Sequence, residues 1–389
     1  MLINDKRALA YTAKIDEIRP IEGYDRVEHA RVGGWWVIVA KNDNFKVGDL
    51  CVYFEVDSKC NENDERFAFL EKRHYKIKTI KMCKVFSQGL IMPLAAFPEV
   101  TATEVNVDLT DILKVTYTVD EDNSRKNDNP NAKYESMRAR HKKFFKTRLG
   151  KWLMKRAWGR KLCFLFLGKK KDNPNRFPTK FVFVHKTDEE RVENIPWILE
   201  NKQPFMITEK LDGTSCTYIL ERKGRKKFEF YVCSRNIRMP APDSKCFHDY
   251  NIYWELAEKY HIYDNLKKYL VENPQADYVC IQGEGVGNVQ GNPLKLDEDA
   301  LYVFNFIDSN GAVPFIVAHN YILEWGMNWV PILDWNYILP DDMETFKDYA
   351  TAKSVVNPDV FREGIVVRRP QDRISFKNVS REYLLAHNG

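Results

Sequence analysis

The first hundred residues are divided by turn signals into short apolar runs, and this spacing restricts what that part of the chain can form. Such runs lie at residues 8–15, 27–32, 35–40, 50–54 and 88–92. Gly33-Gly34 gives a turn signal between the second and the third of them. Short strands at this density suit a small closed barrel, because closure removes exposed sheet edges. We therefore predict an OB-fold-like domain over residues 1–105.

Barrels of this kind commonly bind nucleic acid through a basic face with stacking aromatic side chains. We expect this role for residues 1–105. A barrel that only packs against its neighbour would show the same apolar runs, so this second interpretation stays open.

The composition of the 389 residues is that of a soluble globular protein with more than one domain. Charged residues make up 30%, yet the net charge is only +5, so a uniformly basic surface is not expected. The eight cysteines are scattered without a Cys-x-x-Cys pair, which favours reduced, mostly buried thiols. We find no signal-peptide core and no run of roughly 18 apolar residues. We expect a monomer that is not secreted, binds no membrane and is cytoplasmic, or acts in the cytosol or nucleus of a host.

Residues 106–175 differ in composition from the segments on either side. Residues 120–131 are polar and have the character of a linker. Residues 133–171 contain fifteen Lys or Arg and a single acid, Glu135, with aromatic residues interleaved at helix-like spacing. This pattern suits a polyphosphate partner such as nucleic acid. An amphipathic helix on a membrane surface, or a simple solvated helix, would give the same pattern.

The last part of the chain mixes strand-like and helical stretches and contains a lysine motif at the end of an apolar run. Residues 205–207 lead into Glu209-Lys210-Leu211-Asp212-Gly213. This layout is typical of covalent nucleotidyltransferases, in which an unprotonated lysine attacks the α-phosphate of ATP or GTP. Partial burial and neighbouring cations would favour loss of the lysine proton, and Asp212 can hold a metal-bound water. A polar hairpin turn is the alternative interpretation of this motif.

Three charged positions that follow Lys210 suit the phosphates and a metal ion. Arg235 can reach a phosphate or an incoming strand end, and Lys377 suits the α-phosphate. Glu363 is suited to a divalent metal. Taken singly, these residues also fit a turn or a solvent-facing ion pair.

Two positions between them suit a nucleoside. Glu284 lies between two glycines and can accept hydrogen bonds from ribose hydroxyls. Phe304 can stack on a purine, with Phe306 as the alternative if the register differs. Each also has an ordinary interpretation, as a bulge residue or as core. The ordered set of lysine, arginine, carboxylate, aromatic, carboxylate and lysine favours a single active site.

In this order the motifs resemble those of the ATP-dependent RNA ligases, especially the nick-sealing branch with an N-terminal OB-fold module of the Deinococcus and Naegleria type. The resemblance begins near residue 177, includes residues 186–191, and extends more loosely to the first hundred residues. The matching motifs are Glu209-Lys210-Leu211-Asp212-Gly213, Ser234-Arg235-Asn236, Gly283-Glu284-Gly285, Tyr302-Val303-Phe304, Glu363-Gly364-Ile365-Val366-Val367-Arg368 and Ser375-Phe376-Lys377. The resemblance implies an α+β chain, with an ATP-grasp-like nucleotidyltransferase domain of mixed antiparallel sheets and helices over residues 176–389.

The resemblance also implies a three-step reaction with ATP and either Mg²⁺ or Mn²⁺. Lys210 becomes a lysyl-AMP, the AMP passes to a 5′-phosphate end, and a 3′-hydroxyl of RNA then displaces it. The implied partner is RNA or a nicked duplex that contains RNA, which places the protein in RNA repair. The match to the family adds that Glu209 contacts the adenine and that Asp212 reaches the metal through water.

Two features separate this sequence from related enzymes. Twelve residues follow Lys377, so we expect no OB-fold domain after it, unlike in DNA ligases and mRNA capping enzymes. Ser375 takes the place of the first lysine in the Lys-x-Lys pair that related RNA ligases often carry. The competing hypotheses are a GTP-dependent guanylyltransferase that caps RNA and a nucleic-acid-binding protein without catalytic activity.

Overall fold

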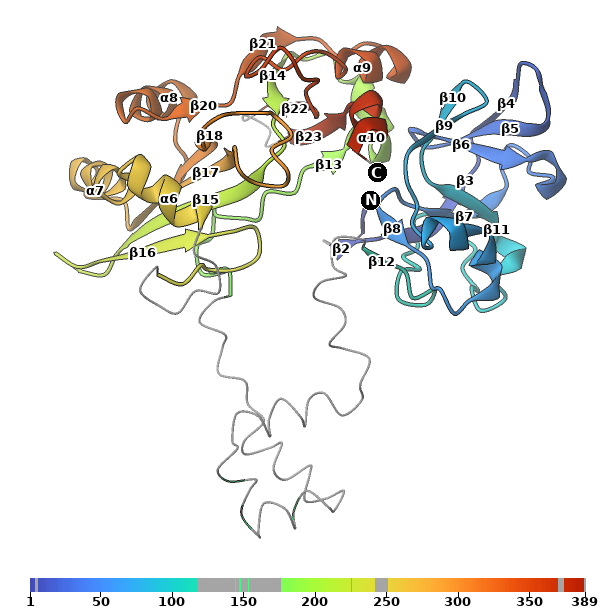
Figure 1. Ribbon diagram of the computed structural model, residues 1–389, viewed down its shortest axis with the longest axis horizontal. Coiled ribbons are helices and arrows are strands. Elements are labelled where there is room, and N and C mark those ends of the chain that lie inside the picture. Colours follow the sequence, from blue (N-terminus) through green and yellow to red (C-terminus); the bar gives the residue numbers. More distant parts are fainter. Residues whose placement is uncertain are drawn as a thin grey trace.

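The computed structural model describes residues 1–3, 6–117, 144, 147, 153, 176–224, 226–241, 251–369 and 374–387. The predicted linker at 120–131, and all but three residues of the basic segment at 133–171, lie outside this set. Figure 1 shows an N-terminal body in blue to cyan and a C-terminal body in green to red. Both chain ends lie where the two bodies meet.

The N-terminal body is built around two three-stranded antiparallel sheets. The first has the order β4–β5–β6 and consists of β4 (Glu17–Ile21), β5 (Tyr24–Val32) and β6 (Trp35–Ala40). The second has the order β11–β7–β3 and consists of β3 (Ala10–Lys14), β7 (Leu50–Phe54) and β11 (Leu90–Pro93). Each of the five predicted runs contributes a strand. Of the six strands in these two sheets, only β4 was not indicated by an apolar run.

Shorter elements surround these sheets and connect them. The paired strands are β1 (Leu2–Ile3) with β2 (Lys6–Arg7), β8 (Ser58–Lys59) with β12 (Thr116–Tyr117), and β9 (Ile80–Met82) with β10 (Val85–Ser87). The 3₁₀ helices are η1 (Lys41–Asp43), η2 (Glu65–Arg73) and η3 (Leu94–Ala96). Ser87 Oγ accepts a hydrogen bond from the Ile38 amide at 3.0 Å, which joins the β9–β10 hairpin to β6.

Aromatic side chains fill the N-terminal body in two clusters. Trp35 and Tyr53 are fully buried between the two sheets, with ring centroids 5.9 Å apart. Phe54, Phe67 and Phe97 form a second buried cluster, in which the rings of Phe54 and Phe67 meet edge to face at 5.3 Å. Burial of these large rings is the main source of stability for a body of this size.

The C-terminal body contains two larger sheets. The five-stranded sheet has the order β13–β23–β22–β14–β21 and consists of β13 (Glu190–Arg191), β14 (Phe205–Lys210), β21 (Ile332–Tyr337), β22 (Gly364–Arg369) and β23 (Ile374–Val379). The six-stranded sheet has the order β16–β15–β17–β18–β19, with β20 paired to β18; its strands are β15 (Thr214–Arg222), β16 (Phe228–Cys233), β17 (Tyr278–Val286), β18 (Ala300–Asp308), β19 (Gly311–Ala312) and β20 (Asn328–Trp329).

Helices cover the sheets of the C-terminal body, as Figure 1 shows. The helices that pack on the six-stranded sheet are α6 (Ile252–Lys259), α7 (Ile262–Glu272) and α8 (Phe315–Glu324). The elements beside the five-stranded sheet are η5 (Val192–Asn194), η6 (Pro196–Glu200), α9 (Met343–Tyr349) and α10 (Arg381–His387). Apolar residues of α6, α7 and α8 are buried against the six-stranded sheet, and apolar residues of η5, η6 and α9 against the five-stranded sheet.

The lysine motif lies where the chain crosses from one sheet to the other. β14 pairs with β21 and β22, whereas β15 pairs with β16 and β17. Residues 211–213 therefore connect two sheets, and the alternative of a hairpin turn is wrong. Gly213 is required for this crossing, because a Cβ there would lie 2.3 Å from the carbonyl oxygen of Gly285.

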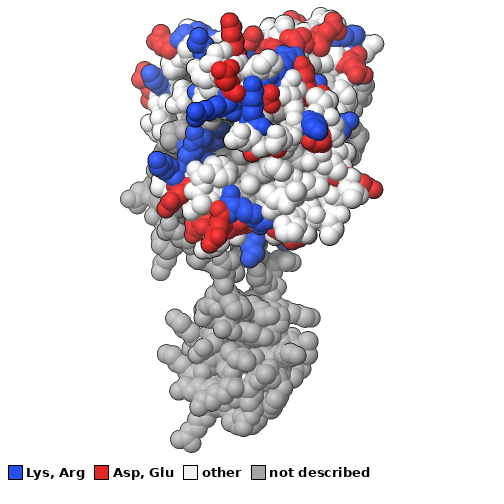
Figure 2. All heavy atoms as spheres, turned by 90° about the vertical axis from the view of Figure 1, so that its right-hand side faces the viewer, with Lys and Arg blue, Asp and Glu red and all other residues white. Residues whose placement is uncertain are grey.

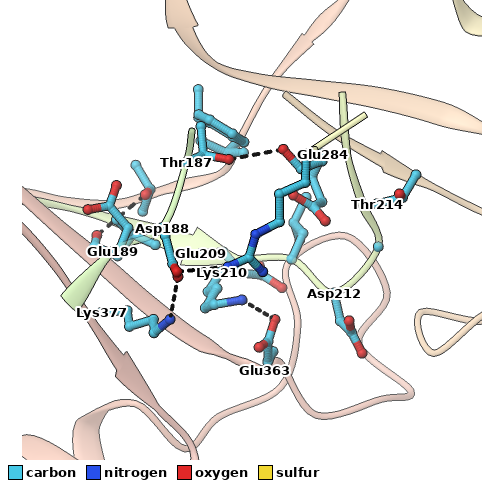
Figure 3. A pocket seen from close by; sticks show the side chains of 18 of the residues that line it. Thr187, Asp188, Glu189, Glu209, Lys210, Asp212, Thr214, Glu284, Glu363 and Lys377 are labelled. Carbon is cyan, nitrogen blue, oxygen red and sulfur yellow. Dashed lines mark hydrogen bonds and ion pairs between the residues drawn. The ribbon is translucent and has the colours of Figure 1, made fainter. Parts of the chain in front are cut away.

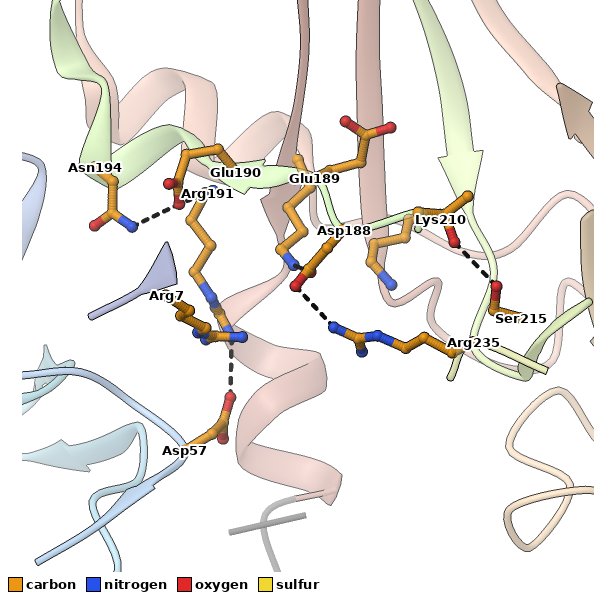
Figure 4. A network of polar contacts seen from close by, with 12 residues as sticks. Arg7, Asp57, Asp188, Glu189, Glu190, Arg191, Asn194, Lys210, Ser215 and Arg235 are labelled. Atoms are coloured by element: carbon orange, nitrogen blue, oxygen red, sulfur yellow. Dashed lines mark hydrogen bonds and ion pairs between the residues drawn. The ribbon is translucent and has the colours of Figure 1, made fainter. Parts of the chain in front are cut away.

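Buried polar contacts join the two bodies. Trp35 Nε1 donates to Asn194 Oδ1 at 2.7 Å, and the Gly34 amide donates to the Glu193 carbonyl at 2.8 Å. A Cβ on Gly34 would lie 2.5 Å from the Glu193 Cα, so the backbones approach too closely for a side chain. Arg191 donates to Asp57 at 3.0 Å across the same junction, as Figure 4 shows. Arg191 belongs to β13, which pairs with β23 beside Lys377. The junction between the two bodies therefore lies next to the strand that carries this lysine.

The surface and the thiols agree with the expectations from composition. Lys and Arg are interspersed with Asp and Glu over most of the N-terminal body in Figure 2, with one denser band of basic side chains toward one edge. The cysteines in the described ranges are free, and all but Cys83 are buried. Of the helices in these ranges, none combines the length and the apolar character that a membrane crossing needs.

Candidate active site

A cavity of about 440 Å³ opens between the two sheets, at the crossing that carries Lys210. Figure 3 shows its polar side chains converging from both sheets. All eight residues predicted as site residues line it: Glu209, Lys210, Asp212, Arg235, Glu284, Phe304, Glu363 and Lys377. They come from segments up to 168 residues apart in the sequence (Glu209 to Lys377), and the fold brings them together on one surface.

Lys210 is the last residue of β14 and its amine is paired with a carboxylate. Nζ lies 2.5 Å from Glu363 Oε2, and both side chains are largely buried. Burial lowers the pKa of Lys210, but the carboxylates of Glu363 and Glu284 outweigh it, so the pKa is raised above its usual value. The two carboxylates thus outweigh the partial burial that would favour loss of the Lys210 proton. In the free protein this amine is protonated and must lose its proton before it can attack.

Two glutamates close to Lys210 have raised pKa values. Burial raises the pKa of Glu284 to about 8, and the nearby Glu363 and Asp212 add to the effect. Burial also raises the pKa of Glu363, with Asp212 contributing and Lys210 opposing it. Clustered carboxylates in a buried site repel one another, so such a site gains from an added cation.

Asp212 is held by the last helix of the described chain. The hydroxyl of Tyr383 on α10 donates a hydrogen bond to Asp212 Oδ2. The Tyr383 ring stacks on His387, with ring centroids 3.9 Å apart. Arg381 anchors the same helix through Glu344 at 2.7 Å and Asp348 at 3.1 Å. The orientation of the motif aspartate thus depends on a helix more than 165 residues away in the sequence.

The opposite side of the cavity carries two cations that share one carboxylate. Arg235 donates to Asp188 Oδ2 at 2.7 Å, and Lys377 Nζ lies 3.5 Å from Asp188 Oδ1. Burial, together with the charge of Arg191, lowers the pKa of Lys377 to about 8. Burial alone would raise the pKa of Asp188, but Lys377 and Arg235 outweigh it, so the pKa is lowered. Two cations facing the cavity form a natural phosphate-binding edge.

Phe304 lies on the same face of β18 as Tyr302, and the bulge at this residue places Phe306 on the other face. Gly283 pairs with Val303 and Gln282 pairs with Asn305, which leaves Phe304 as the extra residue. Arg368 lies over the Phe304 ring at 5.2 Å and donates to the Phe304 carbonyl at 3.1 Å. The alternative, Phe306, is buried in the core between the sheet and α8. The structure therefore places Phe304, and not Phe306, at the cavity.

Glu209 extends from β14 beneath the cavity. Its Oε2 accepts a hydrogen bond from the Val355 amide at 2.8 Å, and its Oε1 has no hydrogen-bond partner among the described residues. Burial raises the pKa of this carboxylate. An unsatisfied buried oxygen costs free energy, so it is a ready acceptor for a ligand amine.

The carboxylates near Lys210 suit a metal ion that arrives with a phosphate ligand. No group of three or more His, Cys, Asp or Glu side chains in the described ranges is arranged to hold a metal alone. Glu363 and Asp212 both line the cavity, however. Mg²⁺ commonly takes one or two protein carboxylates and completes its shell with water and substrate phosphates. The donor set fits such an ion.

Several residues in or beside the cavity were assigned no role from the sequence. Asp188, Tyr383 and Arg368 hold or orient predicted residues, and Tyr117 of β12 brings the N-terminal body to the cavity. Asp188 belongs to the charged run at 186–191, whose composition suggested the family but no specific role. Tyr383 follows the last motif, and only its contact with Asp212 identifies it.

We expect Tyr383→Phe to slow adenylate formation about tenfold while leaving the fold intact. The substitution removes the hydroxyl that holds Asp212, and a hydrogen bond to a charged group contributes about 1.5–3 kcal/mol. The ring stacked on His387 remains. Single-turnover adenylation, followed over time, measures the effect, and the thermal unfolding midpoint controls for folding. An unchanged adenylation rate would show that Tyr383 does not position Asp212.

Comparison with known proteins relates this arrangement to characterised structures. A family model described as RNA ligase matches residues 203–382, and one described as an OB-fold domain matches residues 9–94. The chain is similar to Naegleria gruberi RNA ligase with PPi, at 29% identity and a TM-score of 0.73 over 98% of this chain and 99% of that one. Mutants of that ligase with ATP and Mn, and with AMP and Mn, match with the same identity, coverage and TM-score. No curated protein sequence matches the chain.

These comparisons bear directly on the predicted fold class. The match to the OB-fold family model over residues 9–94 coincides with the two three-stranded sheets of the N-terminal body. The match over residues 203–382 covers the two-sheet body around Lys210. The predicted class, an OB-fold-like barrel followed by an α+β domain, is confirmed.

Proposed function

We propose that the chain joins RNA ends at nicks in an ATP-dependent reaction, because an RNA ligase family model and an OB-fold domain model match it and it is similar to Naegleria gruberi RNA ligase. The proposed product is a phosphodiester bond between an RNA 3′-hydroxyl and a 5′-phosphate. The observation that carries the proposal is the contact of Lys210 with Glu363 inside a cavity lined by all eight predicted residues. The similar Naegleria ligase structures with ATP and Mn support ATP as the substrate and Mn²⁺ or Mg²⁺ as the metal.

In the proposed first step, Lys210 Nζ attacks the α-phosphorus of ATP. A nitrogen–phosphorus bond forms, the bond to the pyrophosphate oxygen breaks, and pyrophosphate leaves with its electron pair. The amine first loses a proton, for which the adjacent Glu363 carboxylate is the nearest acceptor. Such an in-line displacement depends mainly on positioning and on charge neutralisation.

The proposed metal site explains how a protonated lysine becomes a nucleophile. Glu363, together with Asp212 through water, would hold the divalent cation, which supplies positive charge that lowers the pKa of Lys210 and neutralises the phosphate. Tyr383 fixes the Asp212 carboxylate for this contact. The raised pKa values of Glu284 and Glu363 in the free protein reflect the same crowding of negative charge.

The remaining groups divide between the adenosine and the phosphates. Phe304 stacks on the adenine, and the unpaired Oε1 of Glu209 accepts from its amino group. Glu284 binds the ribose hydroxyls. Arg235 and Lys377 bind phosphate, which replaces Asp188 as their partner. This assignment places the base and the reacting phosphate at opposite ends of one cavity.

The second and third proposed steps use the same phosphate-binding edge. The 5′-phosphate of a strand end attacks lysyl-AMP, and Lys210 leaves as a free amine. The RNA 3′-hydroxyl then attacks the adenylylated 5′-phosphate, and AMP leaves. Arg235 is half-exposed at the rim, which suits a residue that meets an incoming strand end.

A comparison of nucleotides and strands tests this function. Protein incubated with labelled ATP is expected to retain AMP, whereas a capping guanylyltransferase would retain GMP from labelled GTP. The adenylated protein is then given nicked duplexes with RNA or DNA on either side of the break, with an unpaired RNA strand as the comparison. We expect sealing where RNA supplies the 3′-hydroxyl at a nick. Retention of GMP alone, or retention of neither nucleotide, would contradict the proposal.

A further inference from the structure

One segment of the N-terminal body carries only positive charge. Residues 72–98 contain six Lys or Arg and no Asp or Glu, although the whole chain has 60 basic and 55 acidic residues. The six cations are Lys72, Arg73, Lys76, Lys78, Lys81 and Lys84. This segment therefore concentrates basic charge on a part of the barrel, as residues 133–171 do outside it.

The fold arranges the last four of these cations along one extended stretch. Lys76 and Lys78 alternate with the buried residues Ile77 and Thr79, so their side chains leave the same side of the chain. Lys81 and Lys84 are exposed on the β9–β10 hairpin that follows. We call Lys76, Lys78, Lys81 and Lys84 the basic strip.

The backbone conformation at the hairpin turn is unfavourable for the two residues that occupy it. Cys83 and Lys84 both adopt left-handed conformations, with φ of 54° and 63°. A turn with two such residues normally contains Asn or Gly, because a Cβ makes the conformation costly. A lysine is therefore kept at the exposed tip despite this cost, as found where a side chain has a function.

The basic strip ends next to the helix that holds Asp212. Lys81 Nζ lies 3.4 Å from Glu382, and Arg381 lies over the Phe86 ring at 4.7 Å. The next residue of α10, Tyr383, donates to Asp212. Figure 1 shows β9 and β10 on the side of the barrel that faces α10. Through Lys81, the strip thus contacts the same helix that contacts the lysine motif.

We propose that the basic strip binds the sugar–phosphate backbone of the RNA duplex beside the break that is sealed. Cations repeated along an extended segment suit a linear polyanion, because successive lysines can meet successive phosphates. Such contacts fix the position of a duplex without reading its sequence. The inference rests on the proposed function and adds the surface that holds the substrate.

The position of the strip separates its role from that of the cavity. Residues of the basic strip do not line the cavity as described around Lys210. Removal of their charge is thus expected to weaken RNA binding and sealing while leaving the reaction with ATP alone unchanged. This difference distinguishes a docking surface from a part of the active site.

The test uses the full chain with Lys78→Gln, Lys81→Gln and Lys84→Gln combined. The matched control is Lys14→Gln, Lys41→Gln and Lys46→Gln, which removes the same charge from exposed positions elsewhere on the barrel. Binding of a labelled nicked RNA duplex is measured over a range of salt concentrations. We expect at least a tenfold higher Kd, and a slope of log Kd against log salt that falls by about 0.7–0.9 for each phosphate that the variant no longer neutralises.

Three outcomes would overturn the proposal. The first is a strip variant with unchanged Kd and salt slope, and the second is an equally weakened control. The third is a matching decrease in adenylation from ATP by a folded strip variant, which would make these lysines part of the active site and not a separate docking surface. Lys84→Glu alone, at the exposed turn, provides a variant with little effect on folding and is expected to raise the Kd in the same direction. If the wild-type protein forms no adenylate, the proposed function fails, whereas the strip is still judged by the binding measurement.

Discussion

Lys210→Ala is expected to abolish formation of the covalent protein–AMP adduct. Lys210 is the one predicted nucleophile in the cavity, and its amine points at the carboxylates that would flank a metal-bound phosphate. Lys377 also lines the cavity, but its amine is paired with Asp188. Protein incubated with labelled ATP and Mn²⁺, and then denatured, reports the adduct directly.

Folding of the Lys210→Ala protein has to be separated from loss of chemistry. Removal of the amine leaves Glu363 without its partner in a buried site, which is destabilising unless the carboxyl takes a proton. Because burial already raises the pKa of Glu363, protonation is readily accessible there. We therefore expect a folded variant, which circular dichroism and a thermal midpoint can check. A labelled adduct in this variant would show that Lys210 is not the nucleophile.

Glu363→Ala is expected to reduce sealing by roughly a hundredfold or more, without loss of folding. The substitution removes the carboxylate proposed to hold the metal beside the α-phosphate, and such electrostatic contributions are typically worth 10²–10³ in rate. Glu363→Gln is the matched variant, since it keeps the size of the side chain and removes only the charge. Rates of sealing and of adenylation, at several Mn²⁺ concentrations, measure the effect.

The two Glu363 variants also distinguish metal binding from simple pairing with Lys210. Without the Glu363 carboxylate the pKa of Lys210 falls, because that charge is the largest contribution that raises it. If Glu363 served only as the ion-pair partner of Lys210, Glu363→Gln would free the Lys210 amine and speed adenylation. If Glu363 holds the metal, both variants lose activity, and added Mn²⁺ recovers part of it. Full activity of either variant would argue against the proposed metal role.

Much of the catalytic cavity was predictable from the sequence because its chemistry depends on residue identity. Lys210, Glu284 and Glu363 each stood in a short motif, and the three lie in one cavity in the structure. The strand runs of the first hundred residues were equally informative, since period and turn signals are local properties. Neither prediction required knowledge of contacts distant in the sequence.

The parts that could not be predicted depend on such distant contacts. Tyr383 holds Asp212 across 171 residues, and Asp188 joins Arg235 to Lys377 from a different segment again. The bulge that places Phe304 and Phe306 on opposite faces of β18 is a register shift between β17 and β18. No local pattern encodes that shift.

The charge around Lys210 also depends on contacts distant in the sequence. The fold brings Glu363 and Glu284 next to Lys210 and holds Lys377 and Arg235 on Asp188. The protein without ligands therefore keeps its nucleophile protonated. In the proposed mechanism, activation comes with the metal and the nucleotide, which ties the reactivity of Lys210 to the presence of substrate.

The most direct test of the account is to locate the AMP on the protein. Wild-type protein is incubated with ATP and Mn²⁺, digested with a protease, and its peptides are analysed by mass spectrometry. The account predicts one AMP-modified peptide, with the modification on Lys210 and a phosphoramidate bond that acid cleaves. An adduct on a different residue, or no adduct from ATP under conditions in which the protein is folded, would contradict it.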